Sequence, residues 1–418
     1  MSAAPGSRQG RVARAGRRWR GLLGADRAAV RQALVALVLN SSTSLVAGAV
    51  LGAITGTFEE HPGLLVLVPA AIGLRGNIFS AVGTRLSTAI HAGTFRFSSR
   101  RDTVLGQNVS AAVVLTLGLS LLLAVIAKVI AVVLGIEGSV SIGDLAVVSV
   151  LGGALASGPV LAATIGVAGG AVRYDWDLDN VSAPLVSTLG DVLTLPALWL
   201  ATSLIGVRVL TPTLAVVVAV VGGVAMVVGL RSPLDDLRRI VRESVPVLAV
   251  ACAVSAMAGV AVEKQLDVFA TYPALLVVLP AFLSSAGALG GVLSSRLGSK
   301  LHLGLVPPQG VPSREARREI ALVALLAAPV FVFNAAGAHL VAGALGQASP
   351  GLVRMLEVTV GGGVLALAFV LVVAYYGTVA AFRVGVDPDT YGIPIVTSTV
   401  DFLGAFALVL VVTALGLG

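Results

Sequence analysis

The sequence predicts an all-α polytopic membrane protein in which two parallel five-helix repeats are joined by one linking transmembrane helix. Three observations predict this class: an apolar composition, eleven long apolar runs, and motifs that recur at a constant spacing. Of 418 residues, 57% are hydrophobic and 12% are charged, whereas soluble domains carry about 25% charged residues. This composition excludes an ordinary soluble domain.

The apolar runs are each long enough for a helix to cross a bilayer, which takes about 20 residues. Counting the linking helix, the eleven predicted spans are 31–55, 62–90, 104–135, 143–171, 181–206, 213–230, 243–262, 272–298, 317–345, 351–380 and 391–417.

Positive charge orients these spans. If the N-terminus is cytoplasmic, the cytoplasmic segments hold 21 of the 28 Lys and Arg residues, and the exterior holds only Arg208, Lys264 and Arg354. The positive-inside rule favours this orientation, which puts the C-terminus outside a plasma membrane. The basic head, residues 1–30, is predicted to meet anionic membrane lipid rather than nucleic acid.

The repeat is visible in short motifs. "PGLLVLVPA" (Pro62–Ala70) and "PALLVVLPA" (Pro273–Ala281) agree at six of nine positions and lie 211 residues apart. At a spacing of 210, Asp191 pairs with Asp401. A five-helix unit therefore occurs twice.

Five spans reverse the side of the membrane, so a second copy would be inverted without an additional span. The apolar run "LTPTLAVVVAVVGGVAMVVGL" supplies that span, and the repeats become parallel. The predicted division is a first repeat at 31–206, a linking helix and cytoplasmic loop at 207–241, and a second repeat at 242–418.

Asp191 and Asp401 lie about ten residues into their helices, or roughly 15 Å, near the bilayer midplane. A carboxylate at that depth usually marks a pathway or a paired site. Two carboxylates balance one divalent ion, and Mg²⁺ prefers oxygen ligands and keeps several waters. A helix-packing role for the two acids is the alternative. Further oxygens one turn before the acids come from Ser187, Thr188, Thr397 and Ser398.

The second and eighth spans are predicted to contain irregular backbone. Pro69 and Pro280 each remove a helical hydrogen bond, and "GLRGN" and "SSAGA" follow them with small residues. Non-helical backbone at membrane depth lines a cavity or is buried in protein; a simple proline kink is the alternative. Asn77 has no equivalent in the second repeat, where Ala288 occupies its place.

The motifs "LVPAAIGLRGNIFSAVGTRLSTA", "DLDNVSAPLVSTLGD" and "DPDTYGIPIVTSTVD" resemble the membrane domain of MgtE-type magnesium transporters, in the tandem form of the eukaryotic solute-carrier relatives. The resemblance implies a central cation pore between two five-helix units, with an acid of each fifth helix holding hydrated Mg²⁺. Those acids fall on Asp191 and Asp401, and the family's glycine-asparagine motif falls on Gly76 and Asn77. It implies Mg²⁺ as the transported ion and no other cofactor.

The favoured function is therefore transport of a divalent cation through a pore that one chain completes, without catalysis. The runner-up is a transporter that couples H⁺ or Na⁺ to another solute through the same aspartates. An intramembrane aspartyl protease is a third class, which the duplicated acid does not support. Four further acids, expected either at the cytoplasmic mouth or as helix-start residues, are Asp177, Asp179, Asp387 and Asp389.

Overall fold

The computed structural model describes residues 8–98, 100–174, 178–384 and 393–417, without the side chains of 8–29, 171, 174, 178–188 and 393. The described chain is helical, with eleven long helices and two short ones. In chain order the helices are α1 (Arg8–Ala53), α2 (Thr55–Glu60), α3 (Leu67–His91), α4 (Val104–Val133), α5 (Ile142–Tyr174), α6 (Leu178–Thr202), α7 (Leu210–Leu230), α8 (Asp235–Glu263), α9 (Leu266–Thr271), α10 (Ala274–His302), α11 (Arg314–Ala344), α12 (Leu352–Val384) and α13 (Ile393–Ala414).

Each predicted span lies on one of the eleven long helices, which confirms the fold class. Within the described residues, nine helices are long and apolar enough to cross a membrane, and the described part of α6 adds the shorter apolar stretch Leu189–Thr202. The remaining long helix, α3, is less apolar because it carries Arg75, Asn77 and Arg85. It begins at Leu67, five residues after the predicted start, because residues 61–66 form turns.

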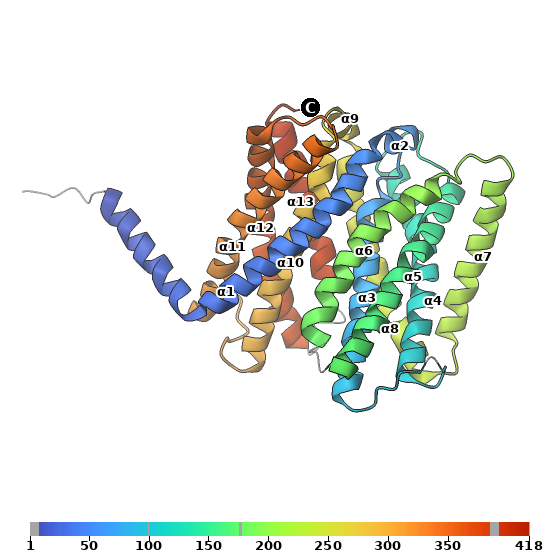
Figure 1. Ribbon diagram of the computed structural model, residues 1–418, viewed down its shortest axis with the longest axis horizontal. Helices are drawn as coiled ribbons and strands as arrows, with labels where there is room; N and C mark the ends of the chain where they lie inside the picture. The colour runs from blue at the N-terminus through green and yellow to red at the C-terminus, as the bar shows by residue number, and fades with distance from the viewer. Residues whose placement is uncertain (1–7, 99, 175–177, 385–392, 418) are drawn as a thin grey trace, which may run out of the picture.

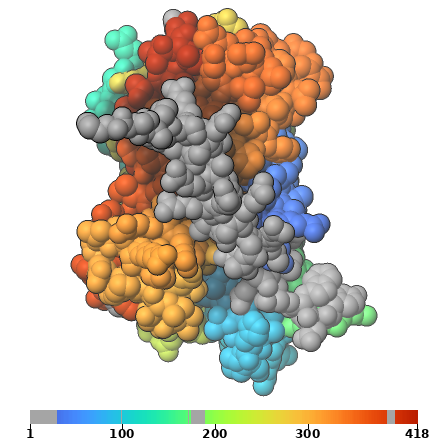
Figure 2. All heavy atoms as spheres, turned by 90° about the vertical axis from the view of Figure 1, so that its left-hand side faces the viewer, coloured from blue at the N-terminus to red at the C-terminus, as the bar shows by residue number. Residues whose placement is uncertain are grey.

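The two halves follow the sequence repeat closely. The short helices α2 and α9 have the same length, are 211 residues apart and contact each other. Both lie at one end of the molecule, here called the α2–α9 end (Figure 1). The described residues of the loops 92–98, 100–103 and 303–313 lie at the opposite end (Figures 1 and 2). Equivalent segments therefore occupy the same side, and the repeats are parallel.

The linking helix α7 lies at the periphery (Figure 1). It packs against α4 and α5, and only 17% of its most apolar stretch is buried inside the protein. A helix that crosses the bilayer without entering the core restores the direction of the chain between the repeats.

The first helix of each repeat is exchanged between the halves. Helix α1 packs against α10 and α11, and α8 packs against α3 and α4, while each also contacts the fifth helix of its own repeat, α6 or α13. Figure 1 shows α1 running obliquely across the other helices. Glycine allows the close approach of backbones: Gly48 faces the backbone of Val277, and Gly259 faces that of Leu65 and Val66.

The predicted irregular backbone is not found. Helices α3 and α10 continue without interruption through the "GLRGN" and "SSAGA" segments. Pro280 lies inside α10, but Pro69 is the third residue of α3, where the backbone N–H has no intrahelical acceptor to lose. Helical backbone therefore carries Asn77 and its neighbours.

Candidate functional site

Each predicted acid is hydrogen-bonded by the first helix of its own repeat. The Ser44 hydroxyl of α1 donates to Asp191 Oδ2 of α6 at 3.2 Å, and the Ser255 hydroxyl of α8 donates to Asp401 Oδ2 of α13 at 3.4 Å. Ser44 and Ser255 are 211 residues apart, so both repeats build the same pair. Asp191 is only 6% exposed, and Asp401 is half-buried.

The second helix of the opposite repeat completes each environment. Ser284 of α10 lies near Asp191 and accepts a hydrogen bond from the Asn40 amide of α1 at 2.9 Å, and a Cβ built at Gly73 of α3 would lie 3.8 Å from Asp401 Oδ2. Positions 73 and 284 are also related by the repeat. The two carboxylates are near enough to interact electrostatically, so the exchange of helices brings together acids from the two halves.

Only some of the other predicted oxygen ligands lie within the described residues. Ser398 is 2% exposed, the Thr397 hydroxyl donates to the Pro394 carbonyl at 3.2 Å, and Asn77 is half-buried on α3. Six predicted positions lie outside the described residues: the side chains of Ser187, Thr188 and Asp179, and the whole of Asp177, Asp387 and Asp389.

Space remains beside the glycine-asparagine motif. No described residue comes within 4 Å of a Cβ built at Gly76 of α3 or at its repeat equivalent, Gly287 of α10. A Cβ built at Gly190, next to Asp191, would lie 3.9 Å from the Gly76 nitrogen. Small residues therefore bring α6 against α3 and leave room on equivalent faces of α3 and α10.

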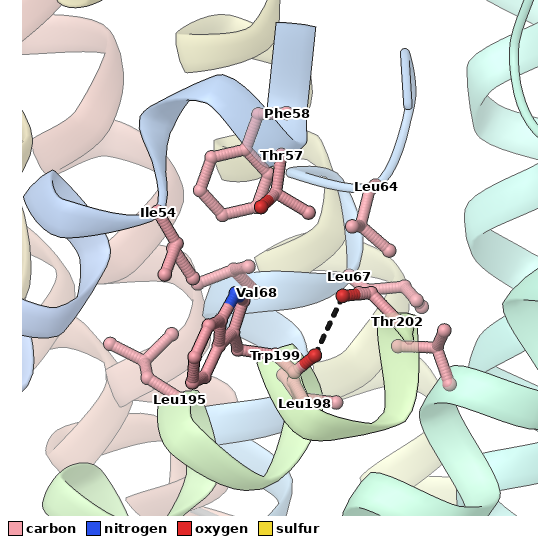
Figure 3. Close-up of a pocket in the computed structure, with 11 residues that line it drawn as sticks. Ile54, Thr57, Phe58, Leu64, Leu67, Val68, Leu195, Leu198, Trp199 and Thr202 are labelled. Carbon is pink, nitrogen blue, oxygen red and sulfur yellow. Dashed lines mark hydrogen bonds between the residues drawn. The ribbon is translucent and has the colours of Figure 1, made fainter. Parts of the chain in front are cut away.

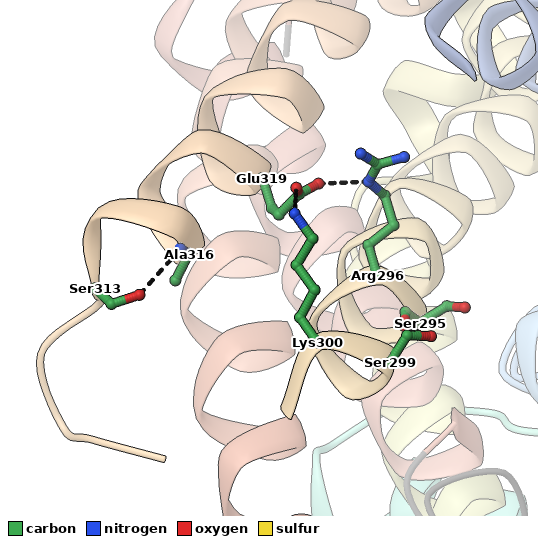
Figure 4. Close-up of polar contacts among 7 residues, drawn as sticks. All are labelled: Ser295, Arg296, Ser299, Lys300, Ser313, Ala316 and Glu319. Carbon is green, nitrogen blue, oxygen red and sulfur yellow. Dashed lines mark hydrogen bonds and ion pairs between the residues drawn. The ribbon is translucent and has the colours of Figure 1, made fainter. Parts of the chain in front are cut away.

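A charge cluster around the buried Glu319 links α10 to α11 (Figure 4), towards the end of the molecule opposite α2 and α9. The carboxylate of Glu319 is 4% exposed and pairs with both Arg296 and Lys300. In the first repeat, the Arg85 guanidinium donates to Asn108 Oδ1 at 2.7 Å, at the positions equivalent to Arg296 and Glu319. Neither the Glu319 cluster nor the Arg85–Asn108 hydrogen bond was predicted from the sequence. The recurrence of Arg85 as Arg296, 211 residues later, was the sequence feature that could have indicated them.

The α2–α9 end has an acidic cleft of about 420 Å³ lined by Glu59, Glu263, Lys264 and Asp267 among others. Glu263 is 8% exposed, and its Oε1 accepts a hydrogen bond from the Gly63 nitrogen at 2.6 Å. Glu263 was not predicted as a site residue from the sequence, because it lies immediately after the predicted span 243–262.

A second hollow at this end is apolar. Figure 3 shows Phe58, Val68, Leu195 and Trp199 around it, with the Thr202 hydroxyl donating to the Trp199 carbonyl at 2.6 Å. No charged side chain lines this hollow, so it is not a candidate cation site.

The acid pair suits a hydrated ion better than a dehydrated one. Within the described residues, no group of three or more His, Cys, Asp or Glu side chains is arranged to hold a metal directly. Two carboxylates with neighbouring hydroxyls can instead accept hydrogen bonds from the water shell that Mg²⁺ gives up reluctantly.

Comparison with known proteins gives a consistent result. Residues 68–201 and 279–411 match the MgtE family, described as divalent cation transporters. Solute carrier family 41 member 3 of Mus musculus is 24% identical, over 84% of this chain and 75% of that protein. Solute carrier family 41 member 2 of Homo sapiens is 24% identical, over 91% of this chain and 69% of that protein. No solved structure matches the chain.

Proposed function

The chain belongs to the MgtE family of divalent cation transporters, and from this premise we propose that it carries Mg²⁺ across the membrane, with Asp191 and Asp401 forming one ion site between its repeats. The observation that carries the proposal is the repeated pair of a fifth-helix acid and a first-helix serine. A helix-packing role would not require both acids to face the partner repeat.

The ion is divalent because of the charge at the site. Two carboxylates that interact in a poorly solvated interior repel each other strongly, and one dication relieves that repulsion. The hydroxyls of Ser44, Ser255 and Ser284 can orient the water of a hydrated ion. Asn77 supplies a further oxygen from one side only, because Ala288 replaces it in the second repeat.

One chain supplies both halves of the pathway. The open faces at Gly76 and Gly287 support a passage between α3 and α10, and the exchanged helices α1 and α8 hold the two halves together. The functional halves are residues 31–206 and 242–418, joined by 207–241, with the basic segment 1–30 against lipid. We place the N-terminus in the cytoplasm and the C-terminus outside the plasma membrane, so that the acidic cleft opens outward.

The test is Mg²⁺ flux into liposomes that contain the purified protein and a trapped indicator. Asp191→Asn and Asp401→Asn keep shape but remove one charge each, so each should reduce Mg²⁺ flux and divalent selectivity, and the double variant should abolish flux. Asp144→Asn, which removes the charge of a half-buried acid at the start of α5 outside the pair, is the control and should retain flux.

The same liposomes test the coupled-transporter alternative. Mg²⁺ flux in the absence of H⁺ and Na⁺ gradients supports the proposal, and flux of either ion without Mg²⁺ movement supports the alternative. Parental Mg²⁺ flux in the double variant would show that the two acids are structural.

A further inference from the structure

Arg75 is a cation buried within the membrane-spanning part of α3. It is 1% exposed. Its Nη1 donates to the Ala71 carbonyl of its own helix, but Nε and Nη2 have no hydrogen-bond partner among the described residues. The titratable group that interacts with it electrostatically is the buried thiol of Cys252 on α8. An arginine stays charged in proteins, so α3 bears a poorly compensated positive charge.

Small residues of α4 and α5 leave the space that the Arg75 guanidinium occupies. The guanidinium lies against Gly153 of α5, where a Cβ would overlap Nη2, and beside the Ser120 hydroxyl of α4. The Ser120 Oγ likewise has no hydrogen-bond partner among the described side chains and backbone. Three helices thus pack closely around a charge that is costly at this depth.

The second repeat fills the equivalent space without a charge. The equivalents of Ala71, Arg75, Ser120 and Gly153 are Phe282, Ala286, Phe331 and Gly363. The nearest atom of the Phe331 ring lies 2.5 Å from a Cβ built at Gly363, so the ring occupies the place that the guanidinium takes in the first repeat. Its ring centroid is 5.1 Å from that of Phe282.

This comparison separates packing from charge. Two aromatic rings satisfy the same framework by apolar contact, so the fold of a repeat does not need an arginine here. Replacing buried ionic groups by well-packed apolar ones is often neutral or stabilising. The charge of Arg75 is therefore retained for something other than stability.

The Cβ of Arg75 also lies beside the segment of α6 that carries Asp191. A Cβ built at Gly190, the residue before Asp191, would lie 3.9 Å from Arg75 Cβ, and Gly76 and Asn77 directly follow Arg75. Arg75 thus belongs to the α3 segment that carries Asn77 and packs beside the α6 segment that carries Asp191, although its guanidinium points to α4 and α5.

We propose that Arg75 is a fixed positive charge that weakens cation binding at the Asp191–Asp401 pair, so that a bound dication can be released. The inference rests on the proposed function. A like charge in a poorly solvated interior raises the energy of the bound ion, and it does so twice as strongly for a dication as for a monovalent ion. Arg75 acts by position, without contacting the ion.

The second repeat itself provides the test variant. Ala71→Phe, Arg75→Ala and Ser120→Phe together transplant its apolar packing into the first repeat, and Arg75→Gln removes the charge alone. Mg²⁺ binding is measured by titration calorimetry of the purified protein, and KM and kcat by flux into liposomes. Both variants should bind Mg²⁺ about tenfold more tightly or more, with lower KM and lower kcat. Arg75→Lys should keep parental values.

Phe331→Leu is the matched control, because it disturbs the equivalent packing in the second repeat without changing charge; its Mg²⁺ affinity should be parental. Neutral variants that fold and bind Mg²⁺ no more tightly than the parent would overturn this inference alone. An Arg75→Lys variant that showed the tighter binding expected of the neutral variants would also overturn it. Parental protein without Mg²⁺ binding or flux would overturn the proposed function and this inference with it.

Discussion

Gly48 and Gly259 are where the exchanged first helices approach the opposite repeat most closely, and replacing them by alanine should loosen the two halves. A Cβ at Gly259 would lie 2.6 Å from Val66 Cα and 2.7 Å from the Leu65 carbonyl oxygen. At Gly48 it would lie 2.8 Å from the Val277 carbonyl carbon and closer still to its oxygen. These atoms are backbone, so no side chain can rotate away.

The cost follows from the distances. Ordinary carbon contacts are about 3.5–4.0 Å, so α1 or α8 would have to move outward by about 1 Å along a long contact. Overpacking of this kind costs about 1–3 kcal/mol. We expect the overpacking to lower the free energy of unfolding by about 2 kcal/mol for Gly259→Ala and by more for Gly48→Ala. The better helix propensity of alanine offsets up to about 1 kcal/mol of this loss.

Thermal unfolding in detergent, followed by tryptophan fluorescence, measures the effect. Gly223→Ala is the control: it lies in α7, and no described residue comes within 4 Å of its built Cβ, so it should leave the melting temperature unchanged or raise it slightly. Both interface variants should melt several degrees lower, since about 1 kcal/mol corresponds to about 2–4 °C in a domain of 150–250 residues. If the two variants unfolded with the control, the close packing of the exchanged helices would be refuted.

Two further predictions concern the charge cluster and the orientation. Glu319→Gln should lower the free energy of unfolding by about 2 kcal/mol, because Arg296 and Lys300 lose the counter-charge that Glu319 supplies while they are themselves partly exposed. Glu357→Gln, which disrupts an exposed pair, should cost less than about 1 kcal/mol, and equal losses would contradict the reasoning. In a Cys252→Ala background, a cysteine at Glu137 should react with an impermeant maleimide from outside intact cells and one at Arg96 should not. The reverse pattern would invert the proposed topology.

The helices and their repeat could be predicted because both are local properties of the chain. The length of each apolar run specifies a span, and the eleven predicted runs fall on the eleven long helices. The recurrence of Asp191 as Asp401 singled out the acids without reference to any contact. The turns at 61–66 were missed because Pro62–Val66 are as apolar as the helix that follows.

The exchange of α1 and α8 could not be predicted in this way. Because the repeats have equivalent surfaces, the first helix can pack on its own second helix or on that of the other repeat, and hydropathy is identical in both cases. The close contacts of Gly48 with Val277 and of Gly259 with Val66 distinguish these arrangements only in three dimensions. Arg75 was likewise visible in "GLRGN", but its lack of partners depends on what α4, α5 and α8 bring to it.

Fusion of two repeats into one chain allows differences that a symmetric pair of subunits cannot have. The framework around the acids is duplicated, yet Arg75, Asn77 and Ser284 each occur on one side only, opposite Ala286, Ala288 and Gly73. In a symmetric dimer, an arginine at position 75 would appear twice and offset both aspartates, leaving no net charge to attract a cation. A single arginine leaves the acid pair with a net negative charge but less than its full attraction. If Asp191 and Asp401 form the proposed ion site, the single chain can therefore adjust the affinity of that site in steps of one charge while both aspartates remain in place.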